Sequence, residues 1–150
     1  MKTTLVRIAA LFLATFFTAA AVAADADWYQ NYDKALAKAK ETGHSVLLDF
    51  TGSDWCPYCI QMDKQVFQTD QFKQYAAKNL VLLKVDFPNS HPLPKEVEDQ
   101  NNKLQEQYGV GGMLPTFILV DKDGKVLTKQ VGALEGGPAA FIAMLEKKQP

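Results

Sequence analysis

Two short apolar runs constrain the fold of this chain more than any other feature. Residues 46–50 and 81–87 are each bounded by polar or turn residues, and each suits a strand buried on both faces of a sheet. The stretch between them, residues 57–78, has helical spacing with an interruption near Thr69 and Asp70. A strand, a helix and a strand in that order normally form a right-handed parallel crossover, so the sequence predicts an α/β fold.

Further elements complete one unit on both sides of this crossover. Asp27 and Gln30 form a capping pair for an amphipathic helix that Gly43 ends. The remaining predicted elements are a helix over 95–108, strands over 116–120 and 126–131 joined as an antiparallel hairpin, and a last helix from Gly137-Pro138. We find no repeat and no internal linker, so we expect a single domain.

The N-terminal segment has the pattern of a secretion signal. Lys2 and Arg7 precede 17 uncharged residues that end in small side chains. We predict a cleaved signal peptide over residues 1–24 and one mature domain over residues 25–150. An uncleaved membrane anchor is the alternative, but a spanning helix needs roughly 20 apolar residues. We therefore expect an exported protein, periplasmic or secreted, with no stable membrane insertion after cleavage.

The charge balance makes nucleic acid an unsuitable partner. Sixteen basic and seventeen acidic side chains give a formal charge of −1, which provides no attraction to a polyanion. Arg7 is the single arginine and lies in the predicted signal peptide, so the mature protein has no guanidinium for bidentate binding of phosphate. We expect no nucleic-acid partner.

The chemistry of the sequence concentrates in Cys56 and Cys59, its only cysteines. They fall where the first predicted strand leads into the following helix, and Pro57 suits the first helical turn. Exposed N–H groups at a helix start favour a thiolate, so Cys56 can become a nucleophile at neutral pH. Cys59, one turn along, can then attack a mixed disulfide on Cys56. The pattern predicts dithiol-disulfide exchange.

Three other interpretations of the cysteine pair are open. A structural disulfide suits an exported protein, although a bridge between residues three apart restrains the unfolded chain little. A zinc site would need two more ligands, and His44 and His91 lack the paired spacing of zinc modules. A binding protein could use the pair as a stable redox switch without turnover. We favour exchange, with no metal and no cofactor beyond the Cys56–Cys59 disulfide itself.

The sequence resembles the thioredoxin superfamily over nearly the whole mature chain. The matching motifs, in the family's order, are Leu48-Asp49-Phe50, Trp55-Cys56-x-x-Cys59, Val85-Asp86, Tyr108-Gly109-Val110, Leu114-Pro115-Thr116 and residues 129–134. Residues 47–67 look most like exported thioredoxin-like proteins and the C-terminal domain of transmembrane thiol-disulfide interchange proteins. The resemblance implies a thioredoxin fold, with a central four-stranded mixed β-sheet flanked by α-helices, and thiol-disulfide oxidoreductase activity.

The resemblance also implies roles for four residues. Cys56 is the nucleophile, Cys59 the resolving thiol, Asp49 the buried acid behind them, and Pro115 the cis-proline that faces the disulfide. Asp49 interrupts an apolar strand, where a carboxylate is costly unless it is paired or active in proton transfer. Its alternative is a satisfied strand-end aspartate. Pro115 could also simply open a strand, a position that proline tolerates without any function.

We assign the substrate-binding surface to Trp55, Pro57, Tyr58 and Leu114. Trp55 could fill the core, but a tryptophan beside a reactive cysteine more often shapes the surface that receives substrate. Asp54 can cap the active-site helix, and its charge would then oppose thiolate formation in Cys56.

Departures from the family pattern affect the same region. One extra residue separates Asp49 from Cys56, and one extra residue precedes Pro115. Leu82 stands where a lysine commonly accompanies the buried acid. The sequence supports a reductase of protein or small-molecule disulfides, with an oxidase or isomerase as the alternative. Its partners would be protein disulfides and a membrane or soluble thiol redox partner.

Overall fold

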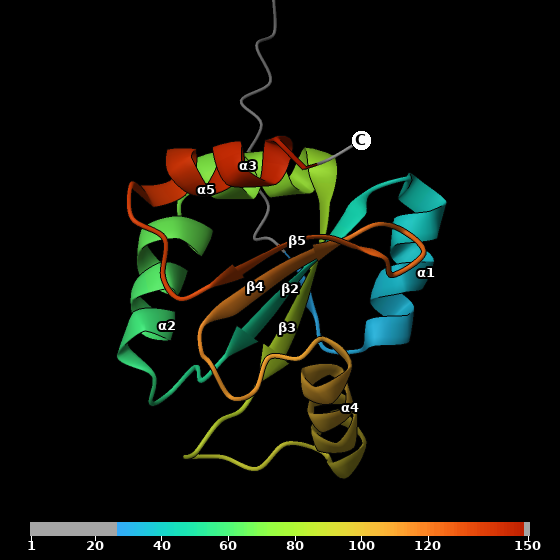
Figure 1. Ribbon diagram of the computed structural model, residues 1–150, viewed down its shortest axis with the longest axis vertical. Helices are drawn as coiled ribbons and strands as arrows, with labels where there is room; N and C mark the ends of the chain where they lie inside the picture. Colours follow the sequence, from blue (N-terminus) through green and yellow to red (C-terminus); the bar gives the residue numbers. More distant parts are fainter. Residues whose placement is uncertain (1–26, 149–150) are drawn as a thin grey trace, which may run out of the picture.

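A five-stranded mixed sheet with helices on both faces forms the body of the protein (Figure 1), in a computed structural model that describes residues 27–148. The strands are β1 (Trp28–Tyr29), β2 (Ser45–Thr51), β3 (Leu80–Asp86), β4 (Thr116–Val120) and β5 (Val126–Val131). The helices are α1 (Tyr32–Thr42), α2 (Pro57–Met62), α3 (Asp70–Asn79), α4 (Lys95–Gln107) and α5 (Gly137–Glu146), with a π-helical turn η1 (Asp63–Phe67) after α2.

The sheet has the strand order β1-β3-β2-β4-β5. β1 and β2 run parallel to β3, whereas β4 is antiparallel to both β2 and β5. All seven residues of β2 are buried, because this central strand has neighbours on both sides and helices above and below it. The predicted parallel crossover and the predicted hairpin are both confirmed.

The beginning of the described chain differs from its prediction. The sequence predicted a helix capped by Asp27 and a sheet of four strands, but Trp28 and Tyr29 form a fifth strand paired with Leu82 and Leu83. The first helix starts only at Tyr32, after Asn31. The side chain of Asn31 accepts a hydrogen bond from Lys34 N at 2.9 Å and caps this helix. Pairing with β3 therefore outweighed the helical spacing of the sequence.

Two apolar cores lie on opposite faces of the sheet. One contains side chains of α1 and α4, and the other contains side chains of α2, η1, α3 and α5. Phe67 is central to the second core, because its ring centroid lies 5.0–5.5 Å from those of four other aromatic side chains. These are Trp28, Phe72, Phe117 and Phe141. This cluster fixes the segment that follows α2 and so holds α2 against the sheet.

Other predicted features agree with the structure. Thr69 caps α3, as the interruption in the helical pattern indicated, and its Oγ1 accepts from Phe72 N at 3.3 Å. Across residues 27–148 no helix is long and apolar enough to cross a membrane. The predicted signal peptide, residues 1–24, lies outside the described residues.

Candidate active site

The two cysteines form a disulfide at the start of α2. Cys56 is the N-cap residue of this helix, and its Sγ accepts a hydrogen bond from Cys59 N at 3.3 Å. Pro57 occupies the first helical turn, where its missing N–H costs nothing. Cys59 Sγ accepts from Gly52 N at 3.5 Å. The cysteine pair therefore lies where the chain passes from β2 to the start of α2, as the sequence predicted.

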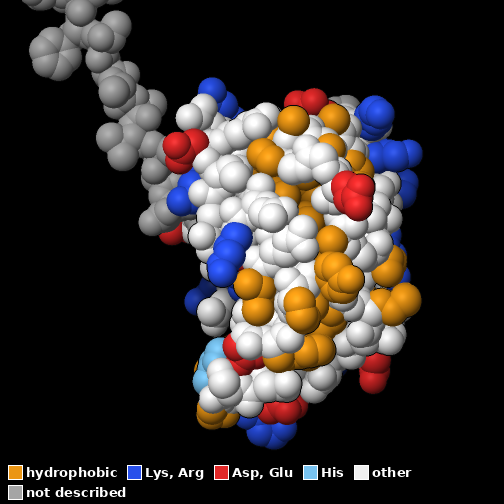
Figure 2. All heavy atoms as spheres, turned by 90° about the vertical axis from the view of Figure 1, so that its left-hand side faces the viewer, with side chains coloured by type: hydrophobic (Ala, Val, Ile, Leu, Met, Phe, Trp, Pro, Cys, Tyr) orange, Lys and Arg blue, Asp and Glu red, His pale blue; other side chains and the backbone are white. Residues whose placement is uncertain are grey.

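Two exposed aromatic residues stand next to the cysteines in the sequence, although both cysteines are themselves buried. Cys56 is 5% exposed and Cys59 is 3% exposed, whereas neighbouring Trp55 and Tyr58 are 46% and 63% exposed. Figure 2 views the side that carries α2 and shows hydrophobic side chains gathered there among mostly uncharged groups. A surface of this kind suits contact with another protein.

One part of the predicted substrate surface is a groove of about 560 Å³ beside α2. Tyr58 and Leu114 line it together with Pro115, and the peptide bond between Leu114 and Pro115 is cis. Sequence reasoning missed the other lining residues, which include Gln61, Gln65, Leu134 and Glu135. It also missed Met113, which is 51% exposed and directly precedes Leu114. The sequence signal that could have pointed to Met113 is its place in the apolar pair Met113-Leu114 directly before Pro115.

Trp55 does not line the groove that contains Tyr58 and Leu114. It lines a second cleft, of about 370 Å³, whose other lining residues come from the end of β3, the loop that follows it and α4. Its Nε1 donates to Phe87 O at 2.7 Å. A Cβ at Gly52 would lie 2.6 Å from Trp55 Cε2, so the indole occupies the space that a side chain there would need. Of the four predicted substrate-binding residues, Trp55 therefore lines one cleft, Tyr58 and Leu114 line the other, and Pro57 lines neither.

Asp54 does not cap α2, which corrects the prediction from the sequence. Cys56 is the N-cap residue, and the carboxylate of Asp54 turns to the loop after β3 instead. There it accepts hydrogen bonds from Asn89 N at 3.0 Å and from Ser90 N at 2.6 Å. The hydrogen bonds from Ser90 and Asn89 lower the pKa of Asp54 to about 2, so the carboxylate stays ionised at neutral pH.

Asp49 is a buried acid in the middle of β2, 4% exposed. Burial raises the pKa of Asp49 to about 7, and the positive charge of Lys84 opposes that rise. Lys84 is the register partner of Asp49 on β3, while Leu82 pairs with Leu47. The charges of Asp63 and Asp86 raise the pKa of Asp49 further. Asp49 therefore has a lysine, Lys84, as its neighbour on β3. In the resemblance to the family, the position that commonly carries such a lysine is occupied by Leu82.

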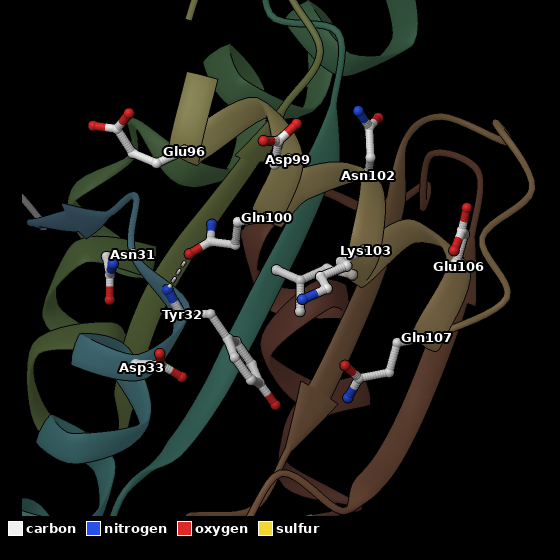
Figure 3. A pocket seen from close by; sticks show the side chains of 11 residues that line it. Asn31, Tyr32, Asp33, Glu96, Asp99, Gln100, Asn102, Lys103, Glu106 and Gln107 are labelled. Atoms are coloured by element: carbon white, nitrogen blue, oxygen red, sulfur yellow. Dashed lines mark hydrogen bonds between the residues drawn. The ribbon is translucent and has the colours of Figure 1, made fainter. Parts of the chain in front are cut away.

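A polar pocket elsewhere on the surface contains none of the predicted site residues. It has a volume of about 910 Å³ and lies between the N-terminal end of α1 and α4 (Figure 3). Tyr32 N donates to Gln100 Oε1 at 2.8 Å across it. Within the described residues, no group of three or more His, Cys, Asp or Glu side chains could hold a metal ion.

A disulfide at a helix start, with a cleft lined by neighbouring Trp55 and another lined by neighbouring Tyr58, defines a site for dithiol-disulfide exchange. The sequence matches the thioredoxin-like domain family over residues 32–149, and the chain belongs to this family. The resemblance to the thioredoxin superfamily is therefore confirmed, together with its fold.

Individual relatives agree with this assignment. Disulfide bond reductase DsbH of Chlamydia pneumoniae is 37% identical over 124 residues, 83% of this chain and 73% of that protein. A solved structure described as a DsbH oxidoreductase matches with a TM-score of 0.77 and 36% identity, covering 83% of this chain and 85% of that one. Thiol:disulfide interchange protein DsbD of Vibrio cholerae is 34% identical over 91 residues, 61% of this chain but 14% of that longer protein. This chain is a thiol-disulfide oxidoreductase.

Proposed function

We propose that the protein reduces disulfides in other proteins, with Cys56 as the nucleophile and Cys59 as the resolving thiol. The observation that carries the roles of the two cysteines is the position of Cys56 Sγ at the N-cap of α2, where it accepts from Cys59 N. After reduction, the same N–H and the helix dipole stabilise a thiolate on Cys56. Cys59 lies one turn inside the helix, where that stabilisation weakens.

The exchange proceeds in two balanced steps. The Cys56 thiolate attacks one sulfur of the substrate disulfide, forms a mixed disulfide and releases the other substrate sulfur as a thiolate that takes up a proton. Cys59 then loses its proton and attacks Cys56 Sγ, which releases the second substrate thiolate. The substrate gains two electrons, and the Cys56–Cys59 pair loses two. A thiol redox partner, membrane-bound or soluble, returns the pair to the dithiol.

Asp49 can take part in the second step. An acid with a pKa of about 7 exchanges its proton readily near neutral pH, because neither of its forms is strongly favoured. We assign Asp49 the removal of the proton from Cys59. Pro115, Tyr58 and Leu114 would hold a substrate segment in the groove beside α2, and Trp55 would contact the substrate on the other side.

The direction of exchange rests on the name of one relative, a disulfide bond reductase. An oxidase or isomerase would use the same geometry with a different potential, since about 30 mV corresponds to 1.4 kcal/mol for this couple. Equilibration with glutathione redox buffers measures that potential. We expect a value near the roughly −270 mV of a reducing thioredoxin, and a value above about −180 mV would favour an oxidase or isomerase.

We also propose that the protein works outside the cytoplasm. The support comes from the sequence alone, where a positively charged start, an uncharged run and small residues form a signal-peptide pattern. Export would also place the protein where its substrates occur, because protein disulfides form and persist in oxidising compartments. Intact mass spectrometry of the exported protein should give a chain beginning at Ala24 or Asp25. Membrane-extracted protein that retains residues 1–23 would contradict this proposal.

A further inference from the structure

Three consecutive residues before Cys56 are each attached to the far end of β3 or to the loop that follows it. Ser53 donates from its backbone N and its Oγ to Asp86, at 3.0 Å and 2.5 Å. Asp54 accepts from Asn89 and Ser90, and Trp55 donates to Phe87 O. The segment that leads into the disulfide is therefore joined to the end of β3 through Ser53 and to the loop through Asp54 and Trp55.

The loop itself, residues 87–94, has few other attachments. Pro88, Pro92 and Pro94 have no N–H to donate, and the loop contains no helix or strand. Among the hydrogen bonds of the described chain, every one that joins residues 88–93 to another segment ends on Asp54. The donors are Asn89 N, Ser90 N and Ser90 Oγ. One carboxylate thus anchors the whole central part of the loop.

The anchored loop, together with α4 and the end of β3, lines the cleft that contains Trp55. Pro88, Asn89, His91, Pro92 and Leu93 line the 370 Å³ cleft together with the indole. Trp55 is confined on its inner side by Gly52, where no Cβ would fit. Its remaining polar attachment is Phe87 O, at the beginning of the same loop. If residues 88–93 moved away, the indole would lose the loop side of its cleft, although its acceptor Phe87 O would stay in place because Phe87 N donates to Thr51 O at 2.9 Å.

We propose that Asp54 is a positioning residue for substrate recognition: by anchoring residues 88–93 it fixes Trp55 beside Cys56, and so it determines affinity for protein disulfides rather than the reactivity of Cys56. This inference rests on the proposed function. A protein substrate must fit against Trp55 and the loop, whereas a small disulfide needs access only to the sulfur of Cys56. Asp54 therefore acts through recognition and does not touch the reacting atoms.

Steady-state kinetics separate these roles. In Asp54→Ala, KM for the disulfides of insulin should rise roughly five- to tenfold with kcat little changed, because a misplaced contact weakens binding. Turnover of hydroxyethyl disulfide should stay within about twofold of the parent. Asp54→Asn removes the charge but keeps one acceptor oxygen, so its KM should lie between those of the parent and Asp54→Ala. If Asp54→Ala and Asp54→Asn raised KM equally, the charge of Asp54 and not its hydrogen bonds to the loop would be responsible, and the proposal would be overturned.

The matched control is Asp121→Ala. Asp121 also holds an exposed turn, accepting from Asp123 N at 2.9 Å and Lys125 N at 3.0 Å, but it lies in the β4–β5 hairpin. Its loss should leave both substrates unaffected. The same rise in KM for Asp121→Ala, or an equal loss of turnover on the small disulfide by Asp54→Ala, would also overturn the proposal.

A spectroscopic measurement tests the positioning without any substrate. The indole N–H resonance of Trp55 can be assigned by its loss in Trp55→Phe, and its hydrogen exchange should accelerate roughly tenfold in Asp54→Ala but not in Asp121→Ala. Unchanged exchange in Asp54→Ala, or faster exchange with an unchanged KM, would contradict the inference. If the proposed function itself is wrong, the parent protein will not reduce insulin. The hydrogen exchange of the Trp55 indole would then be the one measurement that tests whether Asp54 positions Trp55.

Discussion

Asp49 and Lys84 are paired in the parallel register of β2 and β3, so a buried carboxyl group and a partly exposed ammonium group share one face of the sheet. Two residues earlier on each strand, Leu47 and Leu82 belong to the core that contains α2 and η1. Lys84 Nζ also lies 3.8 Å from Asp63 Oδ1, on the turn that follows α2. Burial and the charge of Lys84 thus act in opposite directions on the pKa of Asp49.

This arrangement predicts a catalytic effect of Asp49. In Asp49→Ala, disulfide exchange should slow by at least about tenfold near neutral pH, because general-base assistance to Cys59 is lost. Alkylation of Cys56 by iodoacetamide should stay largely intact, since the helix start that stabilises its thiolate is unchanged. Asp123→Ala, in the distant hairpin, serves as the control. Equal exchange rates in parent and Asp49→Ala from pH 6 to 8 would leave Asp49 a structural residue.

The same acid predicts how stability depends on pH. The pKa of Asp49 is about 7 in the folded protein and near its ordinary value of 3.8 in the unfolded chain. The unfolded state therefore releases this proton first, and the free energy of unfolding should fall as pH rises from about 4 to about 7. The loss attributable to Asp49 is at most roughly 4 kcal/mol.

Urea unfolding of the oxidised protein at several pH values measures this dependence. Asp49→Asn cannot ionise, so its free energy of unfolding should decline less between pH 4 and pH 7 than that of the parent. Parallel curves for the two proteins across that range would show that Asp49 does not have a raised pKa.

The aromatic core under α5 predicts a large effect on stability. Phe141 is fully buried, with ring centroids 5.1 Å from Phe117 and 5.4 Å from Phe67. Phe141→Ala should lower the free energy of unfolding by roughly 3–5 kcal/mol, because it leaves a cavity among rings that cannot collapse fully. Ile142→Ala is the control on the same helix, at a partly buried position, and should cost clearly less. Similar losses in urea unfolding would argue against tight packing around Phe141.

The sequence predicted most elements because their signals are local. The turn residues between β4 and β5 determine a hairpin by themselves, and both strands have the predicted limits. β1 was missed because Trp28 also fits the spacing of the helix that follows it. A strand of two residues exists only through its pairing with β3, and no local pattern records that contact.

The candidate site was predicted in part for the same reason. Cys56, Cys59 and Pro57 occupy positions that follow from a strand leading into a helix. The neighbour of Asp49 depends on strand register, and alignment to the family pointed to Leu82 rather than Lys84. Asp54 was assigned to the nearest helix start, but its partners lie 35 and 36 residues along the chain. Long-range hydrogen bonds of this kind have no signature in sequence spacing.

The central claim is that Cys56 attacks and Cys59 resolves, and trapping of mixed disulfides tests it most directly. Cys59→Ser leaves the first attack but removes resolution, so covalent adducts with substrate proteins should accumulate on non-reducing gels of cells that express the variant. Cys56→Ser should trap little, and the double variant should trap none. Equal adducts in the two single variants, or more in Cys56→Ser, would contradict the assignment of nucleophile and resolving thiol.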